Sequence, residues 1–160
     1  MAYNIDNIVP INVRISPQGL GFANFGSATL FAPESELPVG FAVDTRRVYT
    51  SPDELAEDFA TTTETYKAGV KWLGGTPSMN SLTVWGTADA DATWGDTLAK
   101  ARNEFWWFFT FVTATIYADV AQATEIVTWC NDNRSWFHNN QTGANATAIR
   151  DINDDTDIST

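Results

Sequence analysis

Residues 47–59 read RVYTSPDELAEDF, and this stretch joins an expected strand to an expected helix. Ser51 is a typical N-cap residue, because its hydroxyl accepts a hydrogen bond from an amide of the first helical turn. Pro52 suits the first helical position, and the two acidic residues after it favour the positive end of the helix dipole. The stretch therefore predicts a strand from Phe41 to Tyr49 and a helix that begins at Pro52.

The residues that follow continue the alternation of helix and strand. A second helix is expected from Glu64 to Leu73, because Gly74 and Gly75 can end it and Pro77 prevents its continuation. A short β-rich run follows at residues 81–86, and residues 93–104 have the pattern of a helix. Each connection between these segments is a few residues long, which is typical of a compact domain.

The third part of the chain is rich in aromatic residues. Residues 105–112 form a continuous aromatic run, which predicts a central strand buried on both faces. A long helix is expected from Ile116 to Asn131, and a strand from Trp136 to His138. The order strand, helix, strand, helix, strand favours βαβ units, so the predicted class is α/β with a mainly parallel or mixed sheet flanked by helices.

Upstream of the first long helix, the sequence predicts two strands. Residues 8–15 alternate in polarity, with Ile11, Val13 and Ile15 on one side, which is the pattern of an extended N-terminal β arm. A short apolar strand is expected at residues 27–32. The resulting organisation is an arm at residues 1–24, an α/β domain at residues 25–142 and an acidic tail at residues 143–160.

The charge of the chain limits its partners. Its 160 residues carry a formal net charge of −11, and the isoelectric point is about 4.2. Such a surface repels a phosphate backbone and an anionic membrane, so neither nucleic acid nor a membrane is an expected direct partner. The start of the chain has no signal-peptide pattern, which favours synthesis in a cytoplasm.

The tryptophan content suggests contact surfaces. The chain has 7 Trp residues, and large aromatic side chains fill both cores and the centres of protein interfaces. Trp72, Trp85 and Trp94, with the arm residues Ile11, Val13 and Ile15, are therefore the candidates for contacts between subunits.

No motif of the chain predicts chemistry. Cys130 and His138 are the only residues of their types, so neither a cysteine–histidine metal site nor a disulfide is expected. No phosphate-binding glycine loop and no nucleophile elbow is present. A calcium-like start at Asp89 lacks the required glycine and the closing glutamate. The sequence therefore predicts no catalytic residue, cofactor or metal, and a protein that is not an enzyme.

One long segment, residues 47–86, resembles the sheath proteins of contractile bacteriophage tails. The likeness lies in a "YTS…LAEDF" helix, an "ETYKA" helix, a proline turn and a short strand that ends in glycine. The Gly-rich passage at residues 11–30 and the helix followed by Trp136 and Phe137 fit the same family. The resemblance runs from about residue 8 to residue 142, and its motifs are structural.

The resemblance implies a mechanical function. Sheath subunits stack as rings around an inner tail tube, and their terminal arms add strands to neighbouring subunits. The implied partners are copies of this chain, the tail tube protein and other tail or baseplate proteins. The implied location is the virion, where the tail serves genome ejection, after synthesis in the host cytoplasm. Family members usually continue into a further domain and a C-terminal arm, so the resemblance bears on ring assembly more than on contraction.

Two alternatives remain open at the level of sequence. The first is another structural protein of the tail, such as a tube, collar or decoration protein, which an arm that pairs with an unlike partner would favour. The second is a carbohydrate-binding module or small hydrolase. Exposed tryptophans beside a pair of carboxylates in a cleft would favour that second reading.

Overall fold

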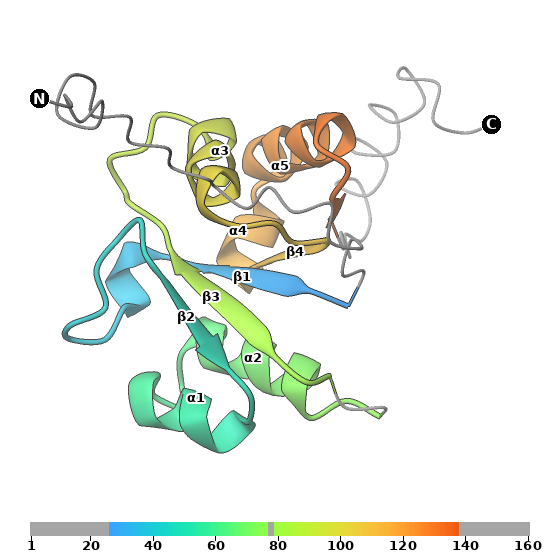
Figure 1. Cartoon of the computed structure of the whole chain (residues 1–160). Coiled ribbons are helices and arrows are strands. Elements are labelled where there is room, and N and C mark those ends of the chain that lie inside the picture. Colours follow the sequence, from blue (N-terminus) through green and yellow to red (C-terminus); the bar gives the residue numbers. More distant parts are fainter. Residues whose placement is uncertain (1–25, 77–78, 138–160) are drawn as a thin grey trace, which may run out of the picture.

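The structure, a computed structural model, describes residues 26–76 and 79–137. This part of the chain contains a five-stranded sheet with the strand order β2-β3-β1-β4-β5. Strands β3, β1, β4 and β5 are parallel to one another, and β2 pairs with β3 in the antiparallel direction. Helices flank the sheet (Figure 1), so the predicted α/β class with a mixed sheet is confirmed.

The bounds of the elements follow the chain in order. The strands are β1 (Ala28–Ala32), β2 (Arg46–Tyr49), β3 (Leu82–Gly86), β4 (Phe109–Val112) and β5 (Trp136–Phe137). A single 3-10 turn, η2 (Glu34–Glu36), follows β1. The helices are α1 (Pro52–Asp58), α2 (Glu64–Leu73), α3 (Trp94–Glu104), α4 (Ala114–Ala118) and α5 (Val120–Asp132).

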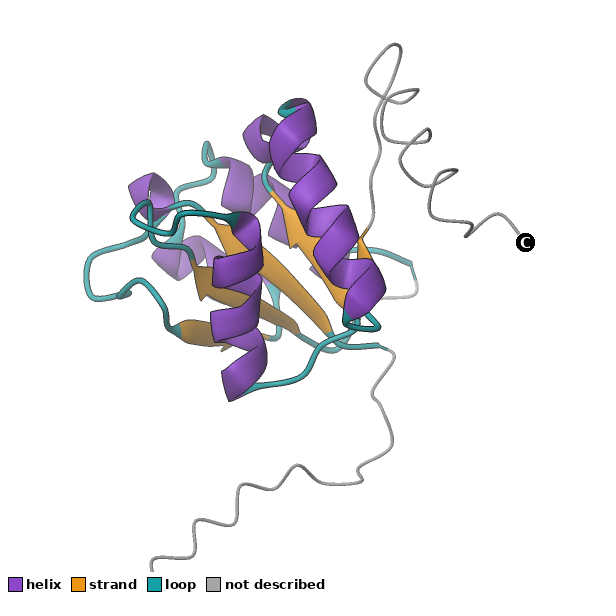
Figure 2. Ribbon diagram, turned by 90° about the horizontal axis from the view of Figure 1, so that it is seen from above, coloured by secondary structure: helices purple, strands orange, loops and turns teal. Residues whose placement is uncertain are grey.

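Strand β1 lies at the centre of the sheet and separates two cores. All of its residues are buried, and alternate side chains point to opposite faces. Leu30 belongs to the core between the sheet and helices α1 and α2, whereas Phe31 belongs to the core between the sheet and helices α3, α4 and α5. In Figure 1 the first pair of helices lies below the sheet and the other three lie above it. Figure 2 shows the upper layer from its outer side, where α3 and α5 contact each other.

Both cores are dense in large side chains. Leu55 and Phe59 fill the lower core, each with no more than 1% of its surface exposed. In the upper core the fully buried Trp107 stacks parallel to Trp129, with ring centroids 5.7 Å apart. Burial of such side chains stabilises a fold by about 2 kcal/mol each. The two cores together fix the sheet between the helix layers.

The predicted helix starts are confirmed by their caps. The Ser51 hydroxyl accepts a hydrogen bond from the Glu54 amide at 3.2 Å, and α1 begins at Pro52 as expected. Thr63 caps α2 and Thr93 caps α3 in the same way. Helix α2 has the predicted bounds, Glu64–Leu73.

Two predicted elements are shorter than expected or divided. The strand expected from Phe41 to Tyr49 is only β2, Arg46–Tyr49, because Asp44 adopts a left-handed φ of 54° just before it. The helix expected from Ile116 to Asn131 is two helices. Asp119 ends α4 and then caps α5, since its carboxylate accepts hydrogen bonds from the amides of Ala121 and Gln122.

The aromatic run at residues 105–112 was predicted as one central strand buried on both faces; the structure has an inner strand only in the second half of the run, and one face of it is half-buried. Only Phe109–Val112 form β4, and the amide of Phe105 instead closes the last turn of α3. Phe109 and Phe111 are half-buried. The reason is that α1 and α2 pack against β2, β3 and β1 and leave the β4 end of that face with little cover.

Several predictions concern residues outside the part that the structure describes. They are the N-terminal arm at residues 1–24, with its contact candidates Ile11, Val13 and Ile15, the acidic tail at residues 143–160, and His138.

Candidate functional site

An aromatic surface lies on the lower face of the sheet at its β4–β5 end. We call it the aromatic half-face and define it as Trp72, Phe109, Phe111 and Trp136. Phe109 and Trp136 are partners in the register of β4 and β5, so their side chains point to the same side. Trp136 is 58% exposed, although a large apolar side chain in a folded domain is usually buried.

The rings of this surface contact one another. The Trp72 ring lies 5.0 Å from that of Phe111 and 5.6 Å from that of Phe109, measured between centroids. The Trp72 indole donates a hydrogen bond to the carbonyl of Ser81 at 3.1 Å, which fixes the ring at the edge of α2. Trp72, one of the predicted contact residues, is therefore half-buried on a preformed aromatic surface.

Trp85, another predicted contact residue, requires a correction. Only 1% of its surface is exposed, and it packs in the upper core with its ring centroid 5.9 Å from that of Phe105. A side chain enclosed in this way belongs to the core, so it is withdrawn as a candidate for contacts between subunits.

The two outer strands of the sheet differ in character. Among the described residues, β2 pairs on one side only, with β3, and β5 pairs on one side only, with β4. Strand β2 carries Arg46 and Arg47, whose guanidinium groups lie over the rings of Phe105 and Phe41. Charged side chains of this kind protect an edge strand from pairing with other chains. Strand β5 is Trp136–Phe137 and carries no charge.

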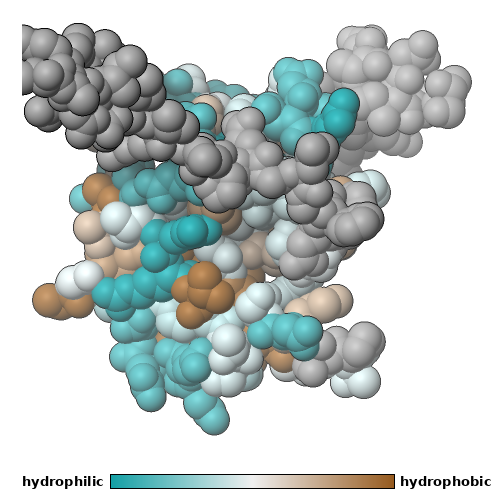
Figure 3. Space-filling view, viewed as in Figure 1, coloured by the Kyte–Doolittle hydropathy of each residue, from teal (hydrophilic) through white to brown (hydrophobic). Residues whose placement is uncertain are grey.

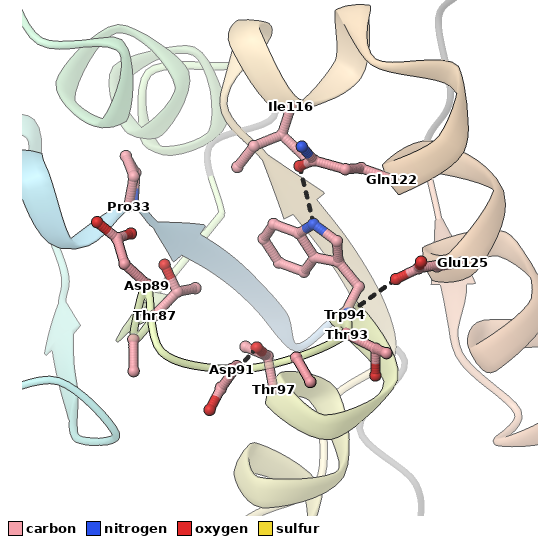
Figure 4. Close-up of a pocket in the computed structure, with 12 residues that line it drawn as sticks. Pro33, Thr87, Asp89, Asp91, Thr93, Trp94, Thr97, Ile116, Gln122 and Glu125 are labelled. Atoms are coloured by element: carbon pink, nitrogen blue, oxygen red, sulfur yellow. Dashed lines mark hydrogen bonds between the residues drawn. The ribbon is translucent and has the colours of Figure 1, made fainter.

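A cavity of about 340 Å³ opens at the carboxyl ends of the central strands. Its walls come from Pro33 after β1, from the loop between β3 and α3, and from Ile116 in α4 (Figure 4). After β1 the chain continues to β2 and then β3, which lie on one side of β1 in the sheet, and after β4 it continues to β5, which lies on the other side. Such a switch point is where open α/β sheets usually bind ligands.

Trp94, the third predicted contact tryptophan, stands in this cavity. Its indole donates a hydrogen bond to the Gln122 side-chain oxygen at 2.9 Å, and its backbone amide donates one to the Glu125 carboxylate at 2.9 Å. Both bonds are drawn in Figure 4. The ring also meets Phe31 edge-on at 6.2 Å between centroids. Trp94 is therefore held by α5 and forms one wall of the cavity.

The acidic side of the cavity is partly neutralised by one lysine. Lys100 forms ion pairs with Asp91 and with Asp44, and the Thr97 hydroxyl donates a hydrogen bond to Asp91 at 2.7 Å. Burial opposes ionisation of Asp91, but the hydrogen bonds from Lys100 and Thr97 outweigh it and lower its pKa. Asp91 is therefore a firmly ionised carboxylate.

Two further groups are structural. The Arg102 guanidinium lies 4.1 Å from the centre of the Trp107 ring and also contacts the rings of Trp106 and Trp129. Burial lowers its pKa. Burial also raises the pKa of the Cys130 thiol to about 11, so this cysteine is a poor nucleophile at neutral pH.

The described residues contain no group of three or more histidine, cysteine, aspartate or glutamate side chains placed to hold a metal ion. Within the same residues, no helix has the length and apolar character needed to cross a membrane. A scan against protein-family models finds no family that matches this chain, and a search of curated proteins finds no match either.

Residue patterns located only part of these surfaces. The aromatic run at residues 105–112 was visible in the sequence, but which of its rings are buried and which are exposed depends on how far α1 and α2 extend across the sheet. The cavity joins Pro33, Trp94 and Gln122, which are far apart in the sequence, and no local signal connects them.

Proposed function

We propose that this chain is a structural subunit that assembles with copies of itself into rings around a bacteriophage tail tube, as a tail sheath protein does. The observation that carries the proposal is the aromatic half-face beside the uncharged edge strand β5. The proposal also relies on the resemblance of residues 47–86 to sheath proteins, which rests on the sequence.

The aromatic half-face has the composition of a protein contact surface. Aromatic side chains are enriched at the centres of interfaces, and tryptophan is frequent among the residues that carry most of the binding energy. Trp136 exposes an apolar ring that gains free energy when a partner covers it. A second copy that covers Trp136, Phe109 and Phe111 would complete the lower layer at the end of the sheet where α2 contributes only Trp72.

The proposed occupant of the β5 edge is the N-terminal arm of a neighbouring subunit. An added strand at this edge would continue the sheet through main-chain hydrogen bonds. Because side chains alternate along a strand, residues Ile11, Val13 and Ile15 would all lie on one face. That face would extend the aromatic half-face next to Trp136.

Strand β2 is the less suitable acceptor. Arg46 and Arg47 belong to this strand, and the Arg47 guanidinium forms an ion pair with the Asp58 carboxylate at 2.8 Å. Figure 3 shows the side of the molecule over β2, where hydrophilic side chains mix with a few isolated apolar ones. A strand added here would meet charge instead of a continuous apolar surface.

The test is assembly of the full chain over a range of concentrations, followed by sedimentation velocity and negative-stain electron microscopy. We expect rings or tubes with a wide lumen in the wild-type protein. Trp136→Lys should raise the concentration needed for assembly by about tenfold or more, since it removes a central aromatic contact. Val39→Lys is the matched control, because Val39 is fully exposed and belongs to the loop before β2 at the other end of the sheet.

A second pair of variants tests the arm. Val13→Asp places a charge on the apolar side of the proposed strand and should block assembly. Asn12→Asp adds the same charge to the opposite side and should assemble like the wild type. Monomers at every concentration, or equal effects within either pair of variants, would contradict the proposal.

A further inference from the structure

Arg102 is a half-buried cation that lacks an acidic partner. It belongs to the last turn of α3, and its guanidinium carbon lies 4.1 Å from the ring centre of Trp107 and 5.3 Å from that of Trp129. None of the ion pairs among the described residues includes Arg102. Within the same residues, the titratable group that acts on its charge is the Cys130 thiol, which is neutral at pH 7 because its pKa is raised to about 11. The charge of Arg102 is therefore uncompensated in the described part of the chain.

Most of the hydrogen-bond donors of Arg102 are also unused. A guanidinium group has five N–H donors. One N–H of Nη2 donates to the Ser135 hydroxyl, which in turn donates to the Trp107 carbonyl at 3.2 Å. The Nε atom is buried and has no hydrogen-bond partner, and the described residues offer none to Nη1. The structural role of Arg102 thus leaves four of its five N–H groups without an acceptor.

An uncompensated cation in such a setting favours an anion as its partner. Burial removes water from the guanidinium and lowers the pKa of Arg102, and an anion that accepts its hydrogen bonds restores part of the lost solvation. The three tryptophan rings around it, those of Trp106, Trp107 and Trp129, hold the group in place. Because a guanidinium is planar, two of its N–H groups can bind both oxygens of one carboxylate. The site therefore fits a carboxylate.

The acidic tail is a source of carboxylates within the chain itself. Residues 151–157 read DINDDTD and contain four aspartates. Phe137, at the end of β5, lies two residues after Ser135 in the sequence, and residues 138–150 connect it to the first of these aspartates. A connection of this length can span up to about 45 Å, so it is long enough to return to Arg102. The tether also gives the tail an effective concentration in about the millimolar range.

We propose that Arg102 binds a carboxylate of the acidic tail, at residues 151–157 of the same chain. The bound aspartate accepts hydrogen bonds from Nη1 and from the second N–H of Nη2, and it ties the tail to the start of β5, where Ser135 already contacts Arg102. The inference does not depend on the proposed assembly, because Arg102 is not part of the aromatic half-face and the tail is not part of the arm.

The test is fluorescence anisotropy of a dye-labelled, amide-capped peptide of residues 151–158, titrated with the full chain. The tail of that chain is first neutralised, so that it does not compete, by Asp151→Asn, Asp154→Asn, Asp155→Asn and Asp157→Asn. The control peptide carries the same four substitutions. We expect the acidic peptide to bind about tenfold more tightly, which is the effect of a hydrogen-bonded charge pair. Equal affinities of the two peptides would overturn the proposal.

Matched variants place the binding at Arg102. Arg102→Gln should abolish the preference for the acidic peptide, and Arg102→Lys, which keeps the charge but not the planar group, should reduce it to about threefold. Arg134→Gln is the control, since it removes the same charge from an exposed arginine next to Ser135. Equal losses in Arg102→Gln and Arg134→Gln would mean that overall charge causes the binding, and the proposal would be wrong. If Arg102→Gln does not fold, Arg102→Lys and the two peptides still decide.

Further titrations identify the source of the carboxylate. The labelled peptide should bind the wild-type chain about tenfold more weakly than the chain with the neutralised tail, because the wild-type tail occupies Arg102. Equal binding to these two chains, or a difference that grows with the concentration of the chain, would overturn binding within one chain. Acetate that displaces the peptide at equal concentration would show that the tail is not the specific occupant.

One more variant keeps this proposal apart from the assembly proposal. Val13→Asp should block assembly, but it should leave the affinity for the acidic peptide unchanged, because the arm is not part of the Arg102 site. Loss of peptide binding in Val13→Asp would contradict a site formed by Arg102 and the tail alone. Failure of either proposal can therefore be recognised without the other.

Discussion

Gly69→Ala is the sharpest test of how α1 packs on α2. Gly69 is buried in α2, and a Cβ atom added to it would lie 2.4 Å from Cδ2 of Leu55 in α1 and 3.2 Å from Cδ2 of Leu82 in β3. Ordinary contacts begin near 3.4 Å, so the Leu55 methyl must move by about 1 Å. Leu55 is fully buried, which leaves it little room.

The expected free-energy change has two opposing parts. Replacing glycine by alanine inside a helix stabilises it by about 1 kcal/mol. Overpacking a buried site costs about 1–3 kcal/mol. We therefore expect Gly69→Ala to lower the free energy of unfolding by about 1 kcal/mol. With a urea m-value of about 2 kcal/mol/M, the midpoint of unfolding falls by about 0.5 M.

Two further variants make the result specific. Leu55→Val removes the atom that causes the clash, so Gly69→Ala in that background should become neutral or stabilising, and a double-mutant cycle measures the coupling. Gly95→Ala is the matched control in α3. Its added Cβ would meet only Thr93 Oγ1 at 3.5 Å and Trp129 Cδ1 at 3.9 Å, so it should raise stability by a few tenths to about 1 kcal/mol.

Urea unfolding followed by circular dichroism and tryptophan fluorescence gives these values. If Gly69→Ala is more stable than the wild type in both backgrounds, α1 does not pack on α2 through Leu55. The reasoning about the lower core would then be wrong, and with it the arrangement of the segment that resembles the sheath proteins.

Three other outcomes follow from the described contacts. Burial opposes ionisation of Asp58, but its hydrogen bonds from Arg47 and Tyr49 outweigh burial and lower its pKa. The ionised carboxylate therefore stabilises the fold above the unfolded pKa of about 3.9, and this stabilisation is lost as the pH falls through the lower pKa of the folded state. Asp58→Asn should lower the free energy of unfolding by about 2 kcal/mol at pH 7, measured by urea unfolding. The difference in unfolding free energy from the wild type should shrink as the pH falls below about 4, and a difference that stays constant contradicts this prediction. The Cys130 thiol is buried and its pKa is raised to about 11, so Ellman's reagent at pH 8 should react with it only after unfolding. Ser51→Ala removes the α1 cap and should lower the unfolding free energy by about 1 kcal/mol, whereas no loss would mean that the cap is not formed in solution.

Local signals predicted most of the fold. The Ser51 cap marked the start of α1, because a hydroxyl that satisfies a terminal amide acts within one turn, and the glycines after Leu73 marked the end of α2. The split at Asp119 was also a local signal, since aspartate is a good N-cap, but the continuous apolar pattern on both sides favoured one helix. Strand order could not be predicted, because it depends on which helices cover which face.

The candidate surfaces were harder to predict for the same reason. Trp72, Trp85 and Trp94 look alike in the sequence, yet they lie on an aromatic surface, in a core and in a cavity. Their positions follow from the alternation of side chains on β3 and from the ends of α2 and α3. Burial of a tryptophan is a property of its neighbours, and the sequence does not state which neighbours the fold supplies.

The charge of the chain sets how its proposed assembly should respond to salt. Subunits with a net charge of −11 repel one another, so added salt, which screens that repulsion, should favour assembly through the uncharged aromatic half-face.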